Sequence, residues 1–226
     1  MNHLPPLALP DRLIEGYEGF RRTRFRRERD HYARLAEAGQ HPTTLMIACV
    51  DSRVAPEVIF DADPGEMVVV RNVANLVPPY QPDAGYHGTS AAIEFAVRVL
   101  TVRDIVVMGH AGCSGVAAFR RNARNAKEGA GSEAEPGDFV SQWMAMLAPA
   151  TALACDSVSP GTDPLDDPVA MELAGIRQSL VNLRTFPWLA ARERSGQLRL
   201  HGLWFDVHDG ALRVLDERAG TFRPLE

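Results

Sequence analysis

The chain has 226 residues, a formal net charge of −5 and a composition that is 46% hydrophobic and 23% charged, which is typical of a globular protein with one full domain. The negative net charge argues against a general affinity for nucleic acid, and no apolar run approaches the ~18 residues of a membrane span. The N-terminal residues lack the basic and apolar regions of a secretory signal, so we expect a cytoplasmic protein.

Residues 11–38 are predicted to form a helix with a partial apolar stripe. The stripe is interrupted by five arginines: Arg21, Arg22, Arg24, Arg26 and Arg27. We interpret them first as a solvated face whose side-chain stems cover apolar surface. A contact with another subunit is the main alternative, because a helix that precedes the first strand needs a surface to pack on. Nucleic acid is the least favoured partner.

Five short apolar or β-branched runs predict strands, and helical patterns separate most of them. The predicted strands cover residues 45–50, 66–70, 104–108, 198–207 and 211–215. The predicted helices cover residues 55–60, 89–100, 116–124, 139–155 and 169–194, the last with a break near Pro187. Asp209-Gly210 is a hairpin turn signal, so the last strand should pair antiparallel at an edge.

This alternation predicts an α/β fold with a mostly parallel central sheet of four to five strands, an antiparallel edge strand and flanking helices. The sequence contains no internal repeat and no linker between domains. We therefore expect a single domain over residues 1–226, in which residues 1–40 form an N-terminal helical arm.

The chain contains three cysteines, a small and odd number that indicates thiols or metal ligands rather than a disulfide framework. Cys155 lies alone in a predicted helix, and we interpret it as a small buried hydrophobic residue. Cys49 and Cys113 instead lie at the carboxyl ends of predicted strands, where the ligand-binding and active sites of open α/β sheets are found.

Two predicted strands end in residues that ligate metals. Cys49, Asp51 and Arg53 follow the first, while His110 and Cys113 follow the third. If these strands are neighbours, two thiolates and one imidazole converge, a set that suits zinc. Three protein ligands are typical of catalytic zinc, which leaves a fourth position for water. Asp51 would lie near that position, where it could bind the water or, in a structural site, the metal itself.

The sequence at these positions resembles the β-class carbonic anhydrases, over residues 43–215. The matching segments are Cys49-x-Asp51-Ser52-Arg53, Arg71-Asn72-Val73-Ala74-Asn75, residues 88–97 (GTSAAIEFAV), Gly109-His110-x-x-Cys113-x-Gly115 and His201-Gly202-x-x-x-Asp206. The pair of Cys-x-Asp-x-Arg and His-x-x-Cys motifs is the most specific part of the likeness.

The resemblance implies Zn²⁺ on Cys49, His110 and Cys113, with Asp51 and Arg53 as a catalytic pair beside it. It implies reversible hydration of CO2 to bicarbonate and a proton by zinc-bound hydroxide, which Asp51 orients while Arg53 keeps Asp51 ionised. It also implies a homo-oligomer, a dimer or a dimer of dimers, in which N-terminal helices wrap over the partner subunit.

A substrate without charge needs a small apolar pocket, for which Val54 and the segment from Val73 to Val77 are candidates. The proton must also leave the site. His87, with Tyr86 beside it, is a candidate relay because an imidazole titrates near neutral pH. The alternative for His87 is an ordinary histidine in a surface loop.

Some members of the family have a second, inhibitory bicarbonate site formed by a Trp, an Arg and a Tyr. The corresponding residues here are Met46, Arg71 and Phe205, so only the arginine of that site remains. We expect a vestigial site at Arg71 that binds bicarbonate weakly or not at all, and an open metal centre near neutral pH.

Two other functions remain open at this point. Hydrolysis of carbonyl sulfide or carbon disulfide would use the same metal centre, and the motif does not separate these substrates from CO2. A non-catalytic zinc protein, acting as a scaffold or a bicarbonate sensor, is the other alternative. The intact Asp51 and Arg53 argue against it, since a scaffold needs no oriented nucleophile.

Overall fold

The computed structural model describes residues 9–83, 85–129 and 138–225. The chain divides into two compact units, residues 1–40 and 41–226. The first unit spans the residues predicted as an N-terminal helical arm. No helix within the described residues is both long enough and apolar enough to cross a membrane.

The N-terminal unit contains three helices, α1 (Asp11–Arg22), α2 (Arg24–Arg27) and α3 (Arg29–Ala38), rather than the one continuous helix predicted. The first break falls at Thr23, whose backbone leaves the helical region at φ −112° and ψ −84°. The Thr23 hydroxyl donates a hydrogen bond to the Gly19 carbonyl at 2.8 Å, a back-bonding contact that bends helices.

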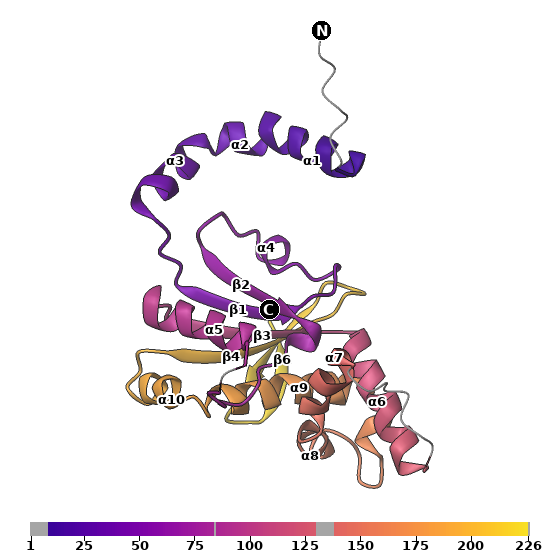
Figure 1. Ribbon diagram of the computed structural model, residues 1–226. Helices are drawn as coiled ribbons and strands as arrows, with labels where there is room; N and C mark the ends of the chain where they lie inside the picture. The colour runs from indigo at the N-terminus through magenta and orange to yellow at the C-terminus, as the bar shows by residue number, and fades with distance from the viewer. Residues whose placement is uncertain (1–8, 84, 130–137, 226) are drawn as a thin grey trace. The chain divides into compact units, whose positions relative to one another are not determined.

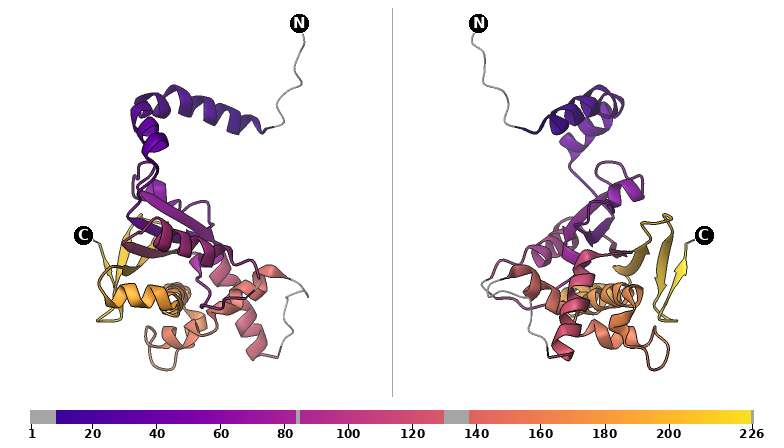
Figure 2. Two further views of the ribbon diagram at one scale, coloured as in Figure 1. Left: turned by 60° about the vertical axis from the view of Figure 1, so that its left-hand side comes forward. Right: turned by 90° about the vertical axis from the view of Figure 1, so that its right-hand side faces the viewer.

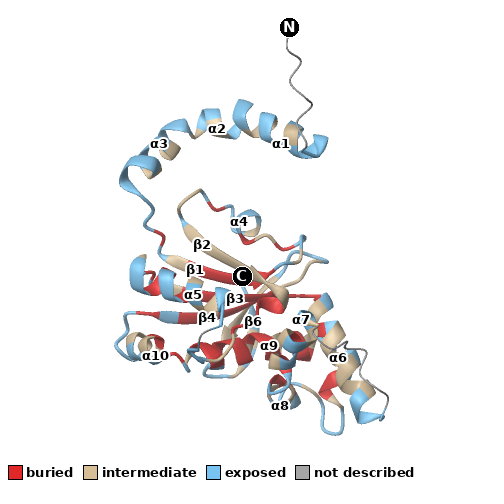
Figure 3. Ribbon diagram, in the orientation of Figure 1, coloured by how far each residue is buried: buried red, intermediate tan, exposed pale blue. Residues whose placement is uncertain are grey.

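Three aromatic rings hold these helices together. Phe20, Phe25 and Tyr32 have ring centroids 5.2 to 6.1 Å apart. Yet none of the three helices contains a buried residue (Figure 3). Leu13 and Tyr17 of α1 are exposed apolar side chains. Residues 9–40, the part of this unit that the structure describes, therefore contain no buried core.

The second unit is built on a six-stranded sheet with the order β2-β1-β3-β4-β5-β6 (Figure 1). Its strands are β1 (Thr44–Cys49), β2 (Met67–Asn72), β3 (Asp104–His110), β4 (Arg199–Phe205), β5 (Leu212–Asp216) and β6 (Thr221–Pro224). The first four pair in parallel, while β5 and β6 are antiparallel. The predicted mostly parallel sheet is confirmed. Strand β6 was not predicted because its four residues include Arg223 and Pro224 and show no apolar alternation.

Helices and short helical turns connect the strands. They are α4 (Pro56–Ile59), η1 (Val73–Asn75), α5 (Gly88–Glu94), η2 (Phe95–Val99), α6 (Ser114–Lys127), α7 (Phe139–Met144), η3 (Ala145–Leu147), α8 (Ala150–Cys155), η4 (Pro164–Asp166), α9 (Pro168–Leu183) and α10 (Pro187–Arg194). Helices α5, α9 and α10 share a hydrophobic core with one face of the sheet (Figure 2). Most residues of α9 are buried.

Two predictions about residues 139–155, the continuity of the helix and the burial of Cys155, differ from the structure. The segment predicted as one helix over residues 139–155 is split into α7, η3 and α8, because Pro149 lacks the N–H that a continuous helix needs. Cys155, at the end of α8, is exposed rather than buried, and its thiol lies 3.4 Å from the carbonyl of Thr151. That expectation for Cys155 was wrong.

Glycines on two neighbouring strands let α9 approach the sheet closely. A Cβ atom at Gly202 of β4 would lie 2.9 Å from Ile176 Cγ2 and 3.2 Å from Leu215. A Cβ atom at Gly109 of β3 would lie 2.8 Å from Ile176 Cδ1. Ile176 is itself completely buried, so it has no free space into which to move.

We therefore expect Gly202→Ala to lower the free energy of unfolding by ~1–3 kcal/mol through overpacking. Gly88→Ala is the matched control, because nothing lies within 4 Å of a Cβ atom there, and it should change stability by less than ~0.5 kcal/mol. Urea denaturation followed by circular dichroism measures both values. Equal losses for the two variants would contradict this account of the packing.

Candidate metal centre

The pairing of β1 with β3 brings the predicted ligands together. The two strands run parallel with Ala48 opposite Met108, so Cys49 ends its strand beside the last residues of β3. His110 closes β3, and Cys113 follows at the start of α6. Gly112 has φ +65°, a backbone conformation that allows the tight turn between His110 and Cys113.

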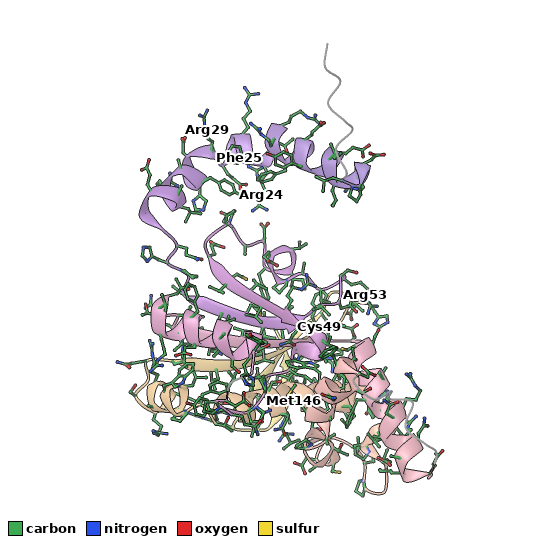
Figure 4. All side chains as sticks on the ribbon, viewed as in Figure 1. Arg24, Phe25, Arg29, Cys49, Arg53 and Met146 are labelled. Atoms are coloured by element: carbon green, nitrogen blue, oxygen red, sulfur yellow. The ribbon has the colours of Figure 1, made fainter. Side chains whose placement is uncertain are left out.

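The ligand atoms of Cys49, His110 and Cys113 all lie within 4.8 Å of one another, and all three residues are buried. The two sulfurs are 3.9 Å apart, too far for a disulfide. Two sulfurs bound tetrahedrally at about 2.3 Å from zinc would be separated by ~3.8 Å. The geometry of the thiols thus fits one shared zinc ion. Cys49 is labelled in Figure 4.

The imidazole of His110 is already oriented for a metal. Its Nδ1 donates a hydrogen bond to the Ala111 carbonyl at 2.9 Å, which fixes the lone pair on Nε2. Nε2 is buried and has no hydrogen-bond partner among the described residues. A buried acceptor without a partner is costly, and a metal ion at this position would satisfy it.

Cys49 and Cys113 do not readily ionise together. The hydrogen bond from the Cys113 thiol lowers the pKa of Cys49 to about 4. The same contact raises the pKa of Cys113, and burial raises it further. A second thiolate beside the first thus needs a compensating positive charge, which a divalent cation would provide.

Asp51 forms a bidentate ion pair with Arg53. Arg53 Nε donates to Asp51 Oδ1 at 2.9 Å, and Nη2 donates to Oδ2 at 2.7 Å. These hydrogen bonds hold the pKa of Asp51 well below its usual range. Asp51 Oδ2 lies 3.9 Å from His110 Nε2, so the carboxylate borders the three ligands. Arg53, labelled in Figure 4, also donates to the Gly112 carbonyl at 3.2 Å and so contacts the loop that follows β3.

Arg71, the residue of the expected vestigial bicarbonate site, binds backbone. Its Nε donates to the Cys49 carbonyl at 2.9 Å, and its Nη2 donates to the Asp51 carbonyl. Arg71 therefore fixes the path of the chain on both sides of Val50. Met46, at the position of the family's tryptophan, is buried in the apolar layer on the other face of the sheet.

A buried carboxylate near the centre was missed from the sequence. Glu172 of α9 is 5% exposed. It accepts a hydrogen bond from the Cys113 backbone N–H at 3.2 Å and another from Trp204 Nε1 at 3.0 Å. Burial raises the pKa of Glu172, and these two donors oppose that shift. The sequence signal that could have identified Glu172 is that it is the single acidic residue in the apolar segment from Pro168 to Ile176.

The candidate pocket residues are apolar and lie beside the ligands. Val54 is completely buried in the same hydrophobic cluster as Cys49 and Cys113, and Val73 packs against that cluster. Trp143 Nε1 donates to the Val73 carbonyl at 2.8 Å. Ala74 has φ +62°, a rare conformation for a residue with a side chain, and such strain concentrates at functional sites.

The candidate relay residues, His87 and Tyr86, do not belong to the hydrophobic cluster that contains Cys49 and Cys113. His87 Nε2 is 2.6 Å from Asp83 Oδ1. His87 lines a cavity of about 370 Å³ with Tyr80 and Trp188, and no metal-ligand candidate lines that cavity. The side chain of Tyr86 is fully exposed.

Comparisons with known proteins identify a family for this chain. The family described as carbonic anhydrase matches residues 44–212. The chain is 34% identical over 213 residues to a carbonic anhydrase of Pseudomonas aeruginosa, covering 94% of this chain and 90% of that one. It is 33% identical over 199 residues to β carbonic anhydrase 5, chloroplastic, of Arabidopsis thaliana, covering 88% of this chain.

The chain spans 62% of the length of that plant relative. Among solved structures, the β-carbonic anhydrase CcaA superposes with a TM-score of 0.81 at 31% identity, covering 96% of this chain and 92% of that one. Since the family matches most of the sequence and the fold agrees, the chain belongs to the β-class carbonic anhydrases.

Proposed function

We propose that this chain catalyses the reversible hydration of CO2 to bicarbonate and a proton, with a zinc ion held by Cys49, His110 and Cys113. The observation that carries the proposal is the meeting of two sulfurs with the unpartnered nitrogen of His110, 3.9 Å from the carboxylate of Asp51. Three protein ligands leave one position for water, as in catalytic zinc sites.

When bound, zinc would supply the polarisation of a water molecule, lowering its pKa from 15.7 towards ~7. Asp51 would accept a hydrogen bond from that water and direct its lone pair towards CO2. Arg53 would keep Asp51 ionised and fix its direction through the two-pronged contact. Arg71 would hold the carbonyls on both sides of Val50 and thereby preserve the spacing between Cys49 and Asp51.

The surroundings support a small uncharged substrate. Val54 and Val73 would form an apolar wall beside the ligands, where CO2 needs no charged partner. For the proton, His87 and Tyr86 are the proposed relay. Both residues are accessible to solvent, although Asp83 beside His87 would favour the protonated imidazole.

We also propose that the chain works as a homo-oligomer. The N-terminal unit has three helices without a buried residue, and the apolar side chains of Leu13 and Tyr17 are exposed. Helices this short are marginal in water without packing. A second copy of the chain would provide the missing surface, as the family resemblance implies.

The first test concerns the ligands. We expect the native protein to contain one zinc ion per chain. Cys49→Ala and His110→Ala should each lose zinc and lower the hydration rate by at least ~100-fold, because even outer-shell changes cost 10–100-fold. Elemental analysis and stopped-flow CO2 hydration provide the measurements. Cys155→Ala is the matched control, since that thiol is exposed. Full activity without metal would refute the proposal.

The second test separates orientation from metal binding. Asp51→Asn and Arg53→Gln should retain zinc but lower kcat by ~10–100-fold, since they remove groups that orient rather than ligate. Arg194→Gln, at the end of α10, is the control for the loss of one arginine and should leave kcat within about twofold. If Asp51→Asn kept the native rate, Asp51 would have no role in orienting the nucleophile.

The third test concerns assembly. We expect the native chain to run as a dimer or a larger species in light scattering coupled to size-exclusion chromatography. Leu13→Asp with Tyr17→Asp should shift this species towards monomer, because a buried unpaired carboxylate is strongly unfavourable. Arg12→Gln with Arg21→Gln, two exposed residues of the same helix, controls for the same change of −2 in net charge. A native monomer at all concentrations would contradict the proposal.

A further inference from the structure

Helix α9 buries a carboxyl group beside the candidate metal centre, and the proposed reaction gives this group no role. Glu172 is buried, and its neighbours Met171 and Ala174 belong to the same hydrophobic cluster as Cys49 and Cys113. Within the described ranges, its hydrogen-bond partners are N–H groups of Cys113 and an indole ring rather than a lysine or an arginine. Burying a carboxyl group without a cation is costly, so its presence at an apolar helix position needs an explanation.

The peptide group between Gly112 and Cys113 is held at both of its polar atoms by side chains from other elements. The carbonyl of Gly112 accepts a hydrogen bond from Arg53 Nη2 at 3.2 Å. The N–H of Cys113 donates a hydrogen bond to Glu172 Oε1, also at 3.2 Å. The C=O and N–H of a planar trans peptide point in opposite directions. Arg53 and Glu172 therefore hold this peptide from opposite sides and fix the orientation of its plane.

This orientation decides where the thiol of Cys113 points. Glycine is conformationally permissive, so Gly112 needs contacts from its surroundings to keep the single conformation at φ +65°. On the other side of Cys113, its carbonyl accepts a hydrogen bond from the N–H of Ala117 at 3.0 Å. Because the peptide groups on both sides of the Cα atom are held, Cys113 directs its sulfur towards that of Cys49, 3.9 Å away.

The second oxygen of Glu172 is held by Trp204 of β4. Trp204 Nε1 donates a hydrogen bond to Glu172 Oε2 at 3.0 Å, and the ring of Trp204 is buried in the main core. Trp204 lies opposite Gly109 in the parallel pairing of β3 with β4. The register of the sheet thus sets the position of the carboxyl group relative to the end of β3, where His110 lies.

We propose that Glu172 is a positioning residue for the metal centre, which fixes the peptide between Gly112 and Cys113 and so keeps the Cys113 sulfur directed at the ion. This role rests on the proposed function, since it concerns zinc held by Cys113. Arg53 would hold the other side of the same peptide through the nitrogen that also binds Asp51. Without Glu172, the buried N–H of Cys113 would lack its acceptor, and the peptide would no longer be held in one orientation.

The affinity for zinc tests this role, measured on the full chain by competition with a chelator. Glu172→Met keeps the length of the side chain but removes both acceptor oxygens. It should weaken zinc binding by at least about tenfold, as expected for a group that supports a ligand. Glu172→Gln keeps one oxygen that can accept the N–H of Cys113, so it should lose less affinity than Glu172→Met. In the Co²⁺-substituted protein, the sulfur-to-metal charge-transfer absorption should fall in the same order.

Gln178→Met is the matched control, because Gln178 is also buried in α9 and donates one hydrogen bond, to Asn182 at 2.9 Å. It should lower the stability of the fold but leave the affinity for zinc within about twofold, since it shares no partner with Glu172. Glu172→Asp, whose carboxyl group is one methylene shorter, provides a second variant if Glu172→Met does not fold. It should also weaken zinc binding by about tenfold.

Two outcomes would overturn the role of Glu172 alone. One is a native chain that binds zinc together with a Glu172→Met or Glu172→Asp variant that binds it equally tightly. The other is equal weakening in the Gln178→Met control, because Glu172 would then support the fold rather than the ligand. A native chain that binds no zinc would instead refute the proposed function, and the role of Glu172 with it.

Discussion

The parallel register between β1 and β3 is the constraint on which the metal centre depends. Cys49 and His110 are far apart in the sequence, and only the hydrogen-bonded pairing of Ala48 with Met108 brings their strand ends level. A shift of one residue would turn every side chain of a strand to the opposite face. The buried apolar residues that fix the register in the core therefore also fix the distance between sulfur and nitrogen at the edge.

The charged residues around the centre mostly act on the backbone. Arg71 binds the carbonyls of Cys49 and Asp51, while Glu172 accepts the N–H of Cys113. Each loop that carries a ligand is thus held by one buried or partly buried side chain from another element. This arrangement holds the candidate ligands in place, which would lower the entropy lost on metal binding.

The sequence was sufficient to predict the mostly parallel sheet and the convergence of Cys49, His110 and Cys113, because buried parallel strands are apolar runs and their ends carry the polar residues. It could not predict the partner of Arg71. An arginine after a strand can bind an anion or a carbonyl, and the path of the loop decides between them. Glu172 was missed for a related reason, since helical periodicity does not reveal which strand end a buried carboxylate faces.

Two incorrect predictions of secondary structure, the single helix over residues 11–38 and the missing strand β6, have different physical causes. The arm was predicted as one helix because a partial apolar stripe runs along residues 11–38, but the hydroxyl of Thr23 donates a hydrogen bond to the Gly19 carbonyl and the helix breaks there. Strand β6 depends on pairing with β5 and has little apolar pattern of its own. The break at Thr23 thus follows from a local side-chain contact, whereas β6 follows from pairing across the sheet, and tertiary contacts routinely override the preferences of single residues.

Trp204 contacts both an arginine of β5 and the buried carboxylate of Glu172. Its ring lies 4.7 Å from the guanidinium of Arg213, and its indole N–H donates to Glu172, which in turn accepts the backbone N–H of Cys113. The ring is 1% exposed and packed in the main core, so it has little freedom to move independently of its neighbours. Loss of the Trp204 indole N–H would therefore leave the buried carboxylate of Glu172 with one donor fewer beside the backbone of Cys113.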